Sequence, residues 1–252
     1  MTDKINILIS NDDGVDAPGI KILAAQINQD HQVTVVAPDK NRSGSSSALT
    51  LDRPLYCEQL DSGFYSVTGT PCDCVHLGSH RLMTQKPEMV ISGINRGANL
   101  ADDVMYSGTV AAAMEGRSMG FPAVALSLAS SQCEFYETAA KVMSKILLRM
   151  KQFSLSSNII LNVNVPDIPF SEIKGYRLTR LGCRHRADTI VPATDPKGKK
   201  VYWIGPPSEP QDIGEGTDFY AIAQGYVSIT PLTVDFTAYQ SFDSVKEWLA
   251  DL

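Results

Sequence analysis

The chain has 252 residues, of which 43% are hydrophobic, so it can bury the core of one sizeable domain. Its formal net charge of −6 argues against a broad cationic face for a nucleic-acid polymer. The five cysteines, an odd number, and an opening segment without a secretory signal predict a reduced, cytoplasmic protein. No apolar run reaches the length of about 18 residues that a membrane-spanning helix needs.

The first 130 residues alternate short β-branched segments with segments of helical pattern. This alternation predicts an α/β fold in which helices cover both faces of a parallel sheet. The predicted strands span residues 5–10, 33–38, 88–93 and 122–128, and the predicted helices span 18–29, 71–82 and 108–119.

A further helix with an apolar stripe is predicted over 135–153, before a strand over 158–166. From residue 168 the pattern changes to strands separated by Pro and Gly turns, and it closes with an amphipathic segment. We therefore predict a core of residues 1–167 and a β-rich appendage of residues 168–252. The appendage contains predicted strands at 176–182 and 226–232, a hairpin at 189–205 and a terminal helix at 242–252.

Polar side chains gather where three predicted strands end. Asp12 and Asp13 follow the first strand, Ser43 follows the second, and Asn95 follows the strand at 88–93. The carboxyl ends of parallel strands share one edge of the sheet, which is where ligands bind. Carboxylate, hydroxyl and amide oxygens suit Mg²⁺ or Mn²⁺ better than zinc. For the acid pair alone, the alternative is an ordinary turn with a helix cap.

The segment Ser107-Gly108-Thr109 opens an alanine-rich helix. Backbone N–H groups, hydroxyls and the positive end of the helix dipole can hold a phosphate there, although ordinary helix capping is the alternative. A cation and an anion site on one edge are what phosphoryl chemistry requires. The sequence contains neither a P-loop nor the glycine fingerprint of dinucleotide binding after the first strand.

Four motifs in this order, NDDG, APDxxRSGSS, SGINRGAN and DDVMYSGTVAAAMEG, resemble the SurE family of 5'/3'-nucleotidases. The resemblance covers about residues 5–130. It implies a Rossmann-like domain, a protruding β-rich region that exchanges between subunits of a homodimer or homotetramer, and one divalent cation per subunit. It also implies removal of phosphate from nucleoside 5'- or 3'-monophosphates, and short polyphosphate is a further candidate substrate.

The family's functional residues map onto matching positions of this chain. Asp12, Asp13, Ser43 and Asn95 match the metal ligands, the same set that the strand ends suggest, and Asp12 or Asp13 would orient the attacking water. The phosphate-holding turn matches Ser107, Gly108 and Thr109. The chain departs from the family at Ala101, where glycine is expected, and over 168–252 it resembles the family only in pattern.

The histidines lie outside this set. His76 and His80 have the spacing of a helical metal pair, but no site acid adjoins them, so we expect structural or surface roles. His31 precedes a strand and is expected to be exposed. His185 lies among arginines at the start of the appendage, where it could meet phosphate or simply be part of a solvated turn.

Two other functions fit part of the pattern. A receiver-type signalling domain also carries an acid pair after its first strand. It also needs an aspartate at the position of Asn95 and a lysine after the fifth strand, and this chain has neither. A non-catalytic nucleotide-binding module would use the same cation and anion sites without turnover. We expect the hydrolase, because a cation that lies beside a phosphate site and is open to water supplies the main requirements of a phosphatase.

Overall fold

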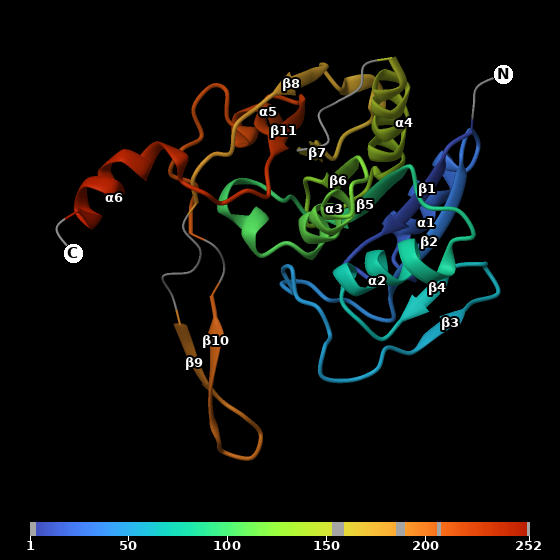
Figure 1. Ribbon diagram of the computed structural model, residues 1–252, viewed down its shortest axis with the longest axis horizontal. Coiled ribbons are helices and arrows are strands. Elements are labelled where there is room, and N and C mark those ends of the chain that lie inside the picture. The colour runs from blue at the N-terminus through green and yellow to red at the C-terminus, as the bar shows by residue number, and fades with distance from the viewer. Residues whose placement is uncertain (1–3, 153–158, 185–189, 206–207, 251–252) are drawn as a thin grey trace.

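The structure is a computed structural model that describes residues 4–152, 159–184, 190–205 and 208–250 (Figure 1). Within these residues a nine-stranded sheet has the order β3-β4-β2-β1-β5-β6-β7-β11-β8. All neighbouring strands from β4 to β7 are parallel, while β3 and β11 are antiparallel to β4 and β7. The strands are β1 (Asn6–Ser10), β2 (Gln32–Pro38), β3 (Cys57–Gln59), β4 (Tyr65–Val67), β5 (Met89–Arg96), β6 (Ala123–Leu128), β7 (Ile160–Val165), β8 (Tyr176–Leu178) and β11 (Val227–Leu232).

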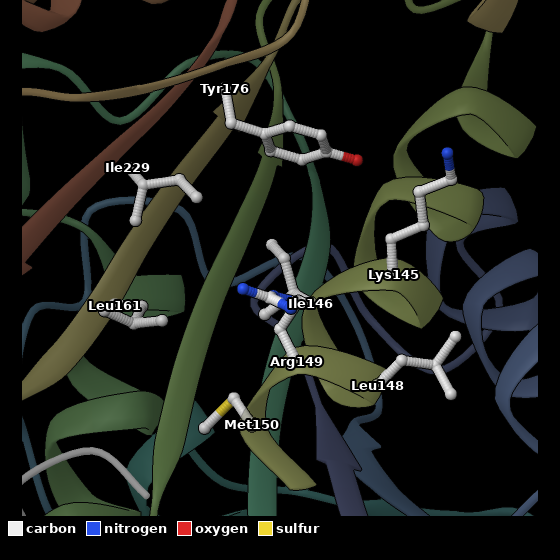
Figure 2. A pocket seen from close by; sticks show the side chains of 8 residues that line it. All are labelled: Lys145, Ile146, Leu148, Arg149, Met150, Leu161, Tyr176 and Ile229. Atoms are coloured by element: carbon white, nitrogen blue, oxygen red, sulfur yellow. The ribbon is translucent and has the colours of Figure 1, made fainter. Parts of the chain in front are cut away.

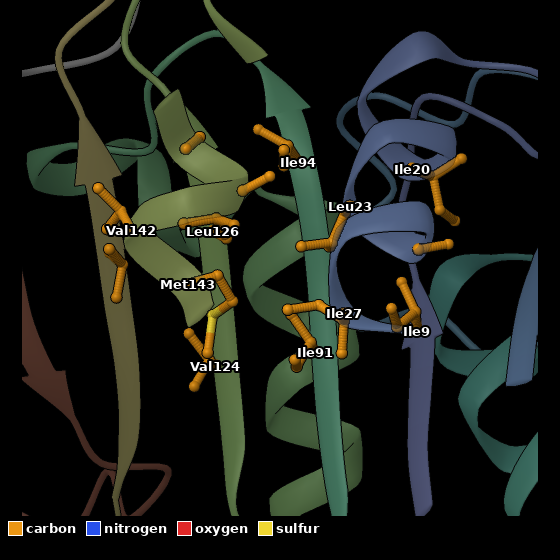
Figure 3. Packing of buried hydrophobic residues seen from close by; sticks show 14 of the residues in the cluster. Ile9, Ile20, Leu23, Ile27, Ile91, Ile94, Val124, Leu126, Val142 and Met143 are labelled. Atoms are coloured by element: carbon orange, nitrogen blue, oxygen red, sulfur yellow. The ribbon is translucent and has the colours of Figure 1, made fainter. Parts of the chain in front are cut away.

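Helices cover both faces of this sheet, so the predicted doubly wound α/β fold is confirmed. On one face, apolar side chains of α1 and α4 pack on β1, β5 and β6 (Figure 3). On the other face, α2 and α3 pack on the same strands. The helices are α1 (Pro18–Ile27), α2 (Pro71–Leu77), α3 (Gly108–Ser118), α4 (Tyr136–Gln152), α5 (Asp218–Ala223) and α6 (Phe242–Leu249), with a π-turn at Gly78–Leu82 and a 3₁₀ turn at Ala101–Met105.

Helix α1 lies unusually close to β5. A Cβ atom at Gly19 would be 2.2 Å from the carbonyl oxygen of Ile94, so only glycine permits this approach. Leu23 and Ile27 of α1 then reach the core beside Ile91 (Figure 3). This contact fixes the end of β5, which carries Asn95.

The C-terminal third of the chain is built in two parts. Strands β8 and β11 extend the central sheet, and α5 packs on β11. The hairpin of β9 (Ile190–Thr194) and β10 (Lys200–Ile204) and helix α6 instead extend away from the sheet (Figure 1). The division at residue 168 stays a prediction, but the segments that protrude are this hairpin and α6.

Several elements differ from the sequence-based expectation. The strand predicted over 176–182 is only the three residues of β8, and the short elements β3, β4 and α5 were not anticipated. The helix at 71–82 ends in the π-turn rather than as a regular helix. In the described parts of the chain, none of the helices is long and apolar enough to cross a membrane.

The prediction that His31 is exposed is wrong. Its side chain is 5% exposed, because the turn between α1 and β2 folds back and its N–H donates to the carbonyl of Ile27 at 3.1 Å. Burial lowers the pKa of this imidazole, the charges of Lys151 and Lys4 lower it further, and Asp30 opposes them. The folded protein therefore favours neutral His31.

This burial predicts a pH dependence of stability. The pKa of His31 is lower in the folded state than its ordinary value of 6.5. The contribution of neutral His31 to the free energy of unfolding is therefore complete above pH 6.5 and decreases as the pH falls below it. We expect His31→Gln to flatten this part of the curve in urea denaturation between about pH 7.5 and about pH 5.5. His80→Gln, at an exposed position, is the control. Equal pH slopes for the wild type and H31Q would contradict the prediction.

Candidate functional site

The loops after β1, β2 and β5 meet at one edge of the sheet, as the parallel order β2-β1-β5 requires. The backbone N–H of Arg42 donates to the carbonyl oxygen of Asp12 at 2.7 Å. The backbone N–H of Arg96 donates to Oδ2 of Asp13 at 2.8 Å. Because Arg42 and Arg96 adjoin Ser43 and Asn95, these two bonds bring all three loops to the acid pair.

The turn that carries the acid pair is fixed by its neighbours. The buried side chain of Asn11 donates to the carbonyl of Gly14 at 2.9 Å and accepts its N–H at 3.3 Å. Gly14 has a φ of +104°, and a Cβ there would lie 3.1 Å from the carbonyl carbon of Lys40. Glycine therefore allows the loops after β1 and β2 to approach each other.

The acid pair is largely withdrawn from water. Asp12 is 4% exposed, and burial raises the pKa of its carboxyl against the lowering effect of hydrogen bonds from Thr109 and the nearby backbone. Burial also raises the pKa of Asp13 to about 6; the Arg96 N–H opposes this shift and the charge of Asp12 adds to it. Two carboxylates held this way are well suited to a cation, which would offset both burial and mutual repulsion.

The other two predicted ligands present neutral oxygens. Asn95 donates through Nδ2 to the carbonyl of Gly97 at 2.8 Å, which leaves its amide oxygen outside that bond. Ser43 is exposed, and its N–H donates to Oδ1 of Asn41 at 2.8 Å. Among the described residues there is no cluster of three or more His, Cys, Asp or Glu that could hold a metal. Two carboxylates with hydroxyl and amide oxygens fit Mg²⁺ or Mn²⁺.

The turn at the start of α3 lies directly against the acid pair. Ser107 caps the helix, since its hydroxyl accepts the N–H of Val110 at 3.1 Å. Thr109 is fully buried, and its hydroxyl donates to Oδ1 of Asp12. A Cβ at Gly108 would lie 2.8 Å from the Cβ of Asp12 and 2.9 Å from Oγ of Ser45. The structure thus joins the predicted cation site and the predicted phosphate turn in one cluster.

A buried polar network that we did not predict supports the loop between β5 and α3. Asn99 donates its N–H to Oδ1 of Asn164 at 2.8 Å, and its carbonyl accepts from the side chains of Asn162 and Asn164 at 2.8 and 3.0 Å. Its own side chain donates to Ser127 at 2.8 Å. The signal was present in the sequence: two asparagines alternate in the otherwise apolar run ILNVNV, so both lie on one face of β7.

The C-terminal third also holds this loop. Fully buried Asp218 accepts the N–H of Ala101 at 2.8 Å and that of Gly182 at 2.9 Å. The N–H of Arg184 donates to Asp102 at 2.8 Å, and its guanidinium pairs with Asp103. Ala101 has a φ of +49°, the left-handed conformation that explains the expectation of glycine there. No local sequence signal points to Asp218.

The side chains of the other candidates that the structure describes make different contacts. His76 contacts Glu115 at 3.1 Å and stacks on His80, while His185 falls outside the described residues. The guanidinium of Arg42 pairs with Asp39 at 3.0 Å, and Nε of Arg96 donates to the carbonyl of Ser131 at 3.2 Å.

A cavity of about 730 Å³ also opens between α4 and the far strands of the sheet (Figure 2). Its lining is mainly aliphatic, and it contains none of the predicted site residues. The cavity is lined by Lys145, Ile146, Leu148, Arg149, Met150, Leu161, Tyr176 and Ile229.

Comparisons with known proteins agree with the sequence motifs. The family model described as survival protein SurE matches residues 7–188. The protein named 5'-nucleotidase SurE of Pseudoalteromonas atlantica is 53% identical over 248 residues, 98% of this chain and 100% of that protein. The protein of the same name from Legionella pneumophila is 53% identical, with 98% of each chain covered. The crystal structure of the SurE protein from Aquifex aeolicus has a TM-score of 0.85 at 42% identity, covering 96% of this chain and 99% of that one.

The contact between Gly108 and Asp12 generates a prediction. In Gly108→Ala the added methyl group must displace Asp12 or Ser45, since their atoms lie within 3 Å of its position. We expect Mn²⁺ affinity, measured by isothermal titration calorimetry, to fall about tenfold or more. Ser118→Ala, at an exposed position of the same helix, should leave the affinity unchanged. An unaltered affinity in G108A would contradict the prediction that the methyl group displaces Asp12 from its position as a ligand.

Proposed function

Since the chain belongs to the SurE family, we propose that it is a 5'-nucleotidase, which hydrolyses nucleoside monophosphates to nucleoside and phosphate. One observation carries this proposal: the acid pair after β1 contacts the N-terminus of α3. Thr109, in the first turn of that helix, donates its hydroxyl to Asp12. This contact supports a cation site directly beside an anion site, a pairing suited to hydrolysis of a phosphate ester.

We propose that one divalent cation per subunit, Mg²⁺ or Mn²⁺, is held by Asp12, Asp13, Ser43 and Asn95. Their all-oxygen donor set and the burial of the two carboxylates support this assignment. When bound, such a cation polarises a phosphate oxygen and lowers the pKa of a coordinated water. Ser43 acts as a ligand and not as a nucleophile, so no phosphoseryl enzyme forms.

The protein's own groups have two further tasks. Asp12 or Asp13 orients the attacking water; Asp13 is the more exposed of the two. The turn of Ser107, Gly108 and Thr109, with the positive end of the α3 dipole, faces the phosphate and balances its charge as the leaving oxygen departs.

We also propose that the chain forms a homo-oligomer through the region after residue 168, as a dimer or a tetramer. Every residue of α6 is exposed, and α6 and the β9–β10 hairpin both project from the sheet (Figure 1). Their apolar side chains would be buried by association with a second copy. The large exposed ones are Ile190, Val191, Tyr202, Trp203 and Ile204 in the hairpin and Phe242, Val245, Trp248 and Leu249 in α6.

For the location we propose the cytoplasm. All five cysteines are free thiols, and that of Cys57 is exposed, which suits a reducing compartment.

The catalytic proposal is tested at Asp13. We expect Asp13→Asn to lower Mn²⁺-dependent phosphate release from nucleoside monophosphates by about a hundredfold, because it removes a charged ligand. Asp16→Asn is the matched control: Asp16 follows in the same loop but is exposed and pairs with Lys21 at 2.9 Å. A chelator should stop the wild type.

The same assay with sugar phosphates and short polyphosphate defines the substrate class. No release from any substrate would favour a binding module. Turnover with the chelator present, or a trapped phosphoseryl enzyme at Ser43, would contradict the mechanism.

Assembly is tested by sedimentation at micromolar concentration. We expect the wild type to exceed the mass of one chain, and Trp248→Glu in α6 to shift it toward smaller species, since a buried charge opposes association. Lys246→Glu, on the same helix, controls for the added charge. A wild-type monomer would refute the proposal.

A further inference from the structure

We propose that the side chain of Thr109 is a positioning group for Asp12, and that substrate phosphate does not bind to it. This inference rests on the cation site proposed above. It assigns one side chain of the phosphate turn to a different task from that implied by the family resemblance.

The burial of Thr109 is the first argument. Its exposed fraction is 0%, whereas Asp13 is partly exposed and Ser43 is exposed. A phosphate in solution therefore has no direct path to the Thr109 hydroxyl. The backbone of the turn and the other two residues can still serve the substrate.

The second argument is the hydrogen bond itself. A hydroxyl has one hydrogen to donate, and Thr109 donates it to Oδ1 of Asp12. Asp12 is itself buried, so its carboxylate accepts hydrogen bonds from Thr109 and from nearby backbone N–H groups instead of from water. A carboxylate that is fixed through one oxygen presents the other in a defined direction, as hydrogen-bond partners of metal ligands commonly do.

The third argument is the rigidity of the support. Thr109 lies in the first turn of α3, which packs on β5 and β6 through Val110, Ala112 and Ala113. A Cβ at Gly116 would lie 2.6 Å from Val90 of β5, so the helix sits directly on the sheet. Asp12 follows β1, and Thr109 lies on a helix that packs on the neighbouring strands of the same sheet, so the packing of the sheet and helix positions both residues.

Two substitutions separate the possible roles. Thr109→Val keeps the shape and removes the hydroxyl, whereas Thr109→Ser keeps the hydroxyl. The readouts are Mn²⁺ affinity without substrate, by calorimetry, and the inhibition constant of inorganic phosphate at saturating Mn²⁺. We expect T109V to bind Mn²⁺ about 10- to 100-fold more weakly with phosphate inhibition unchanged, and T109S to remain within about threefold of the wild type for both.

Ser118→Ala is the matched control, because Ser118 is exposed on the same helix and its hydroxyl donates to the carbonyl of Met114 at 2.9 Å, away from Asp12. We expect its Mn²⁺ affinity to equal that of the wild type. Thermal unfolding of each variant shows whether it is folded at the assay temperature. If T109V is unfolded there, the comparison of T109S with Thr109→Ala replaces it.

The outcomes are distinct. Wild-type Mn²⁺ affinity in T109V would overturn the inference. If phosphate inhibition were weaker in that variant while the Mn²⁺ affinity was unchanged, the Thr109 hydroxyl would be a phosphate ligand instead. Failure of the wild type to release phosphate from any monophosphate would refute the proposed function instead. The Mn²⁺ comparison would still report on Thr109 in that case.

Discussion

Two carboxylates side by side at the end of a buried strand are the constraint on which this site depends. Burial raises the pKa of Asp12. Burial also raises the pKa of Asp13, and the negative charge of Asp12 raises it further. The groups around the pair oppose this cost: the Thr109 hydroxyl and the Arg96 N–H donate to them. These bonds compensate only in part, so the pair is suited to the divalent cation that we propose.

The parallel sheet brings residues that are far apart in the sequence into contact. Asp12 and Asp13 are hydrogen-bonded to Arg42 in the loop after β2, to Arg96 at the end of β5 and to Thr109 in the first turn of α3. These groups meet because β1 lies between β2 and β5 and because α3 packs on β5. Two glycines permit this closeness from opposite sides. Gly14 lets two loops meet, and Gly19 lets α1 approach the end of β5. The site is therefore as rigid as the packing of the sheet.

The alternating pattern and the motifs at strand ends were enough to predict the central fold and the grouping of Asp12, Asp13 and the turn at 107–109. They succeed because the edge of a parallel sheet follows from strand order alone. The burial of His31 and the bond from Asp218 to Ala101 were out of reach. The bond between Ala101 and Asp218 joins residues more than 100 positions apart, which no local periodicity encodes. His31 is buried by the way the turn after α1 folds back, and its residue type does not indicate this. Short elements such as β3 and α5 likewise exist through tertiary contacts and not through propensity.

The bond between Asp218 and Ala101 has a consequence for the order of events during protein synthesis. The carboxylate that holds the loop ahead of Ser107 is made 117 residues after its partner. Strand β11, which covers the edge of β7, is made later still. A nascent chain that ends near residue 167 contains Asp12 and Asp13, but it leaves the buried N–H of Ala101 without its acceptor and the edge of β7 without β11. The loop ahead of Ser107 therefore gains this hydrogen bond only after residue 218 has been synthesised.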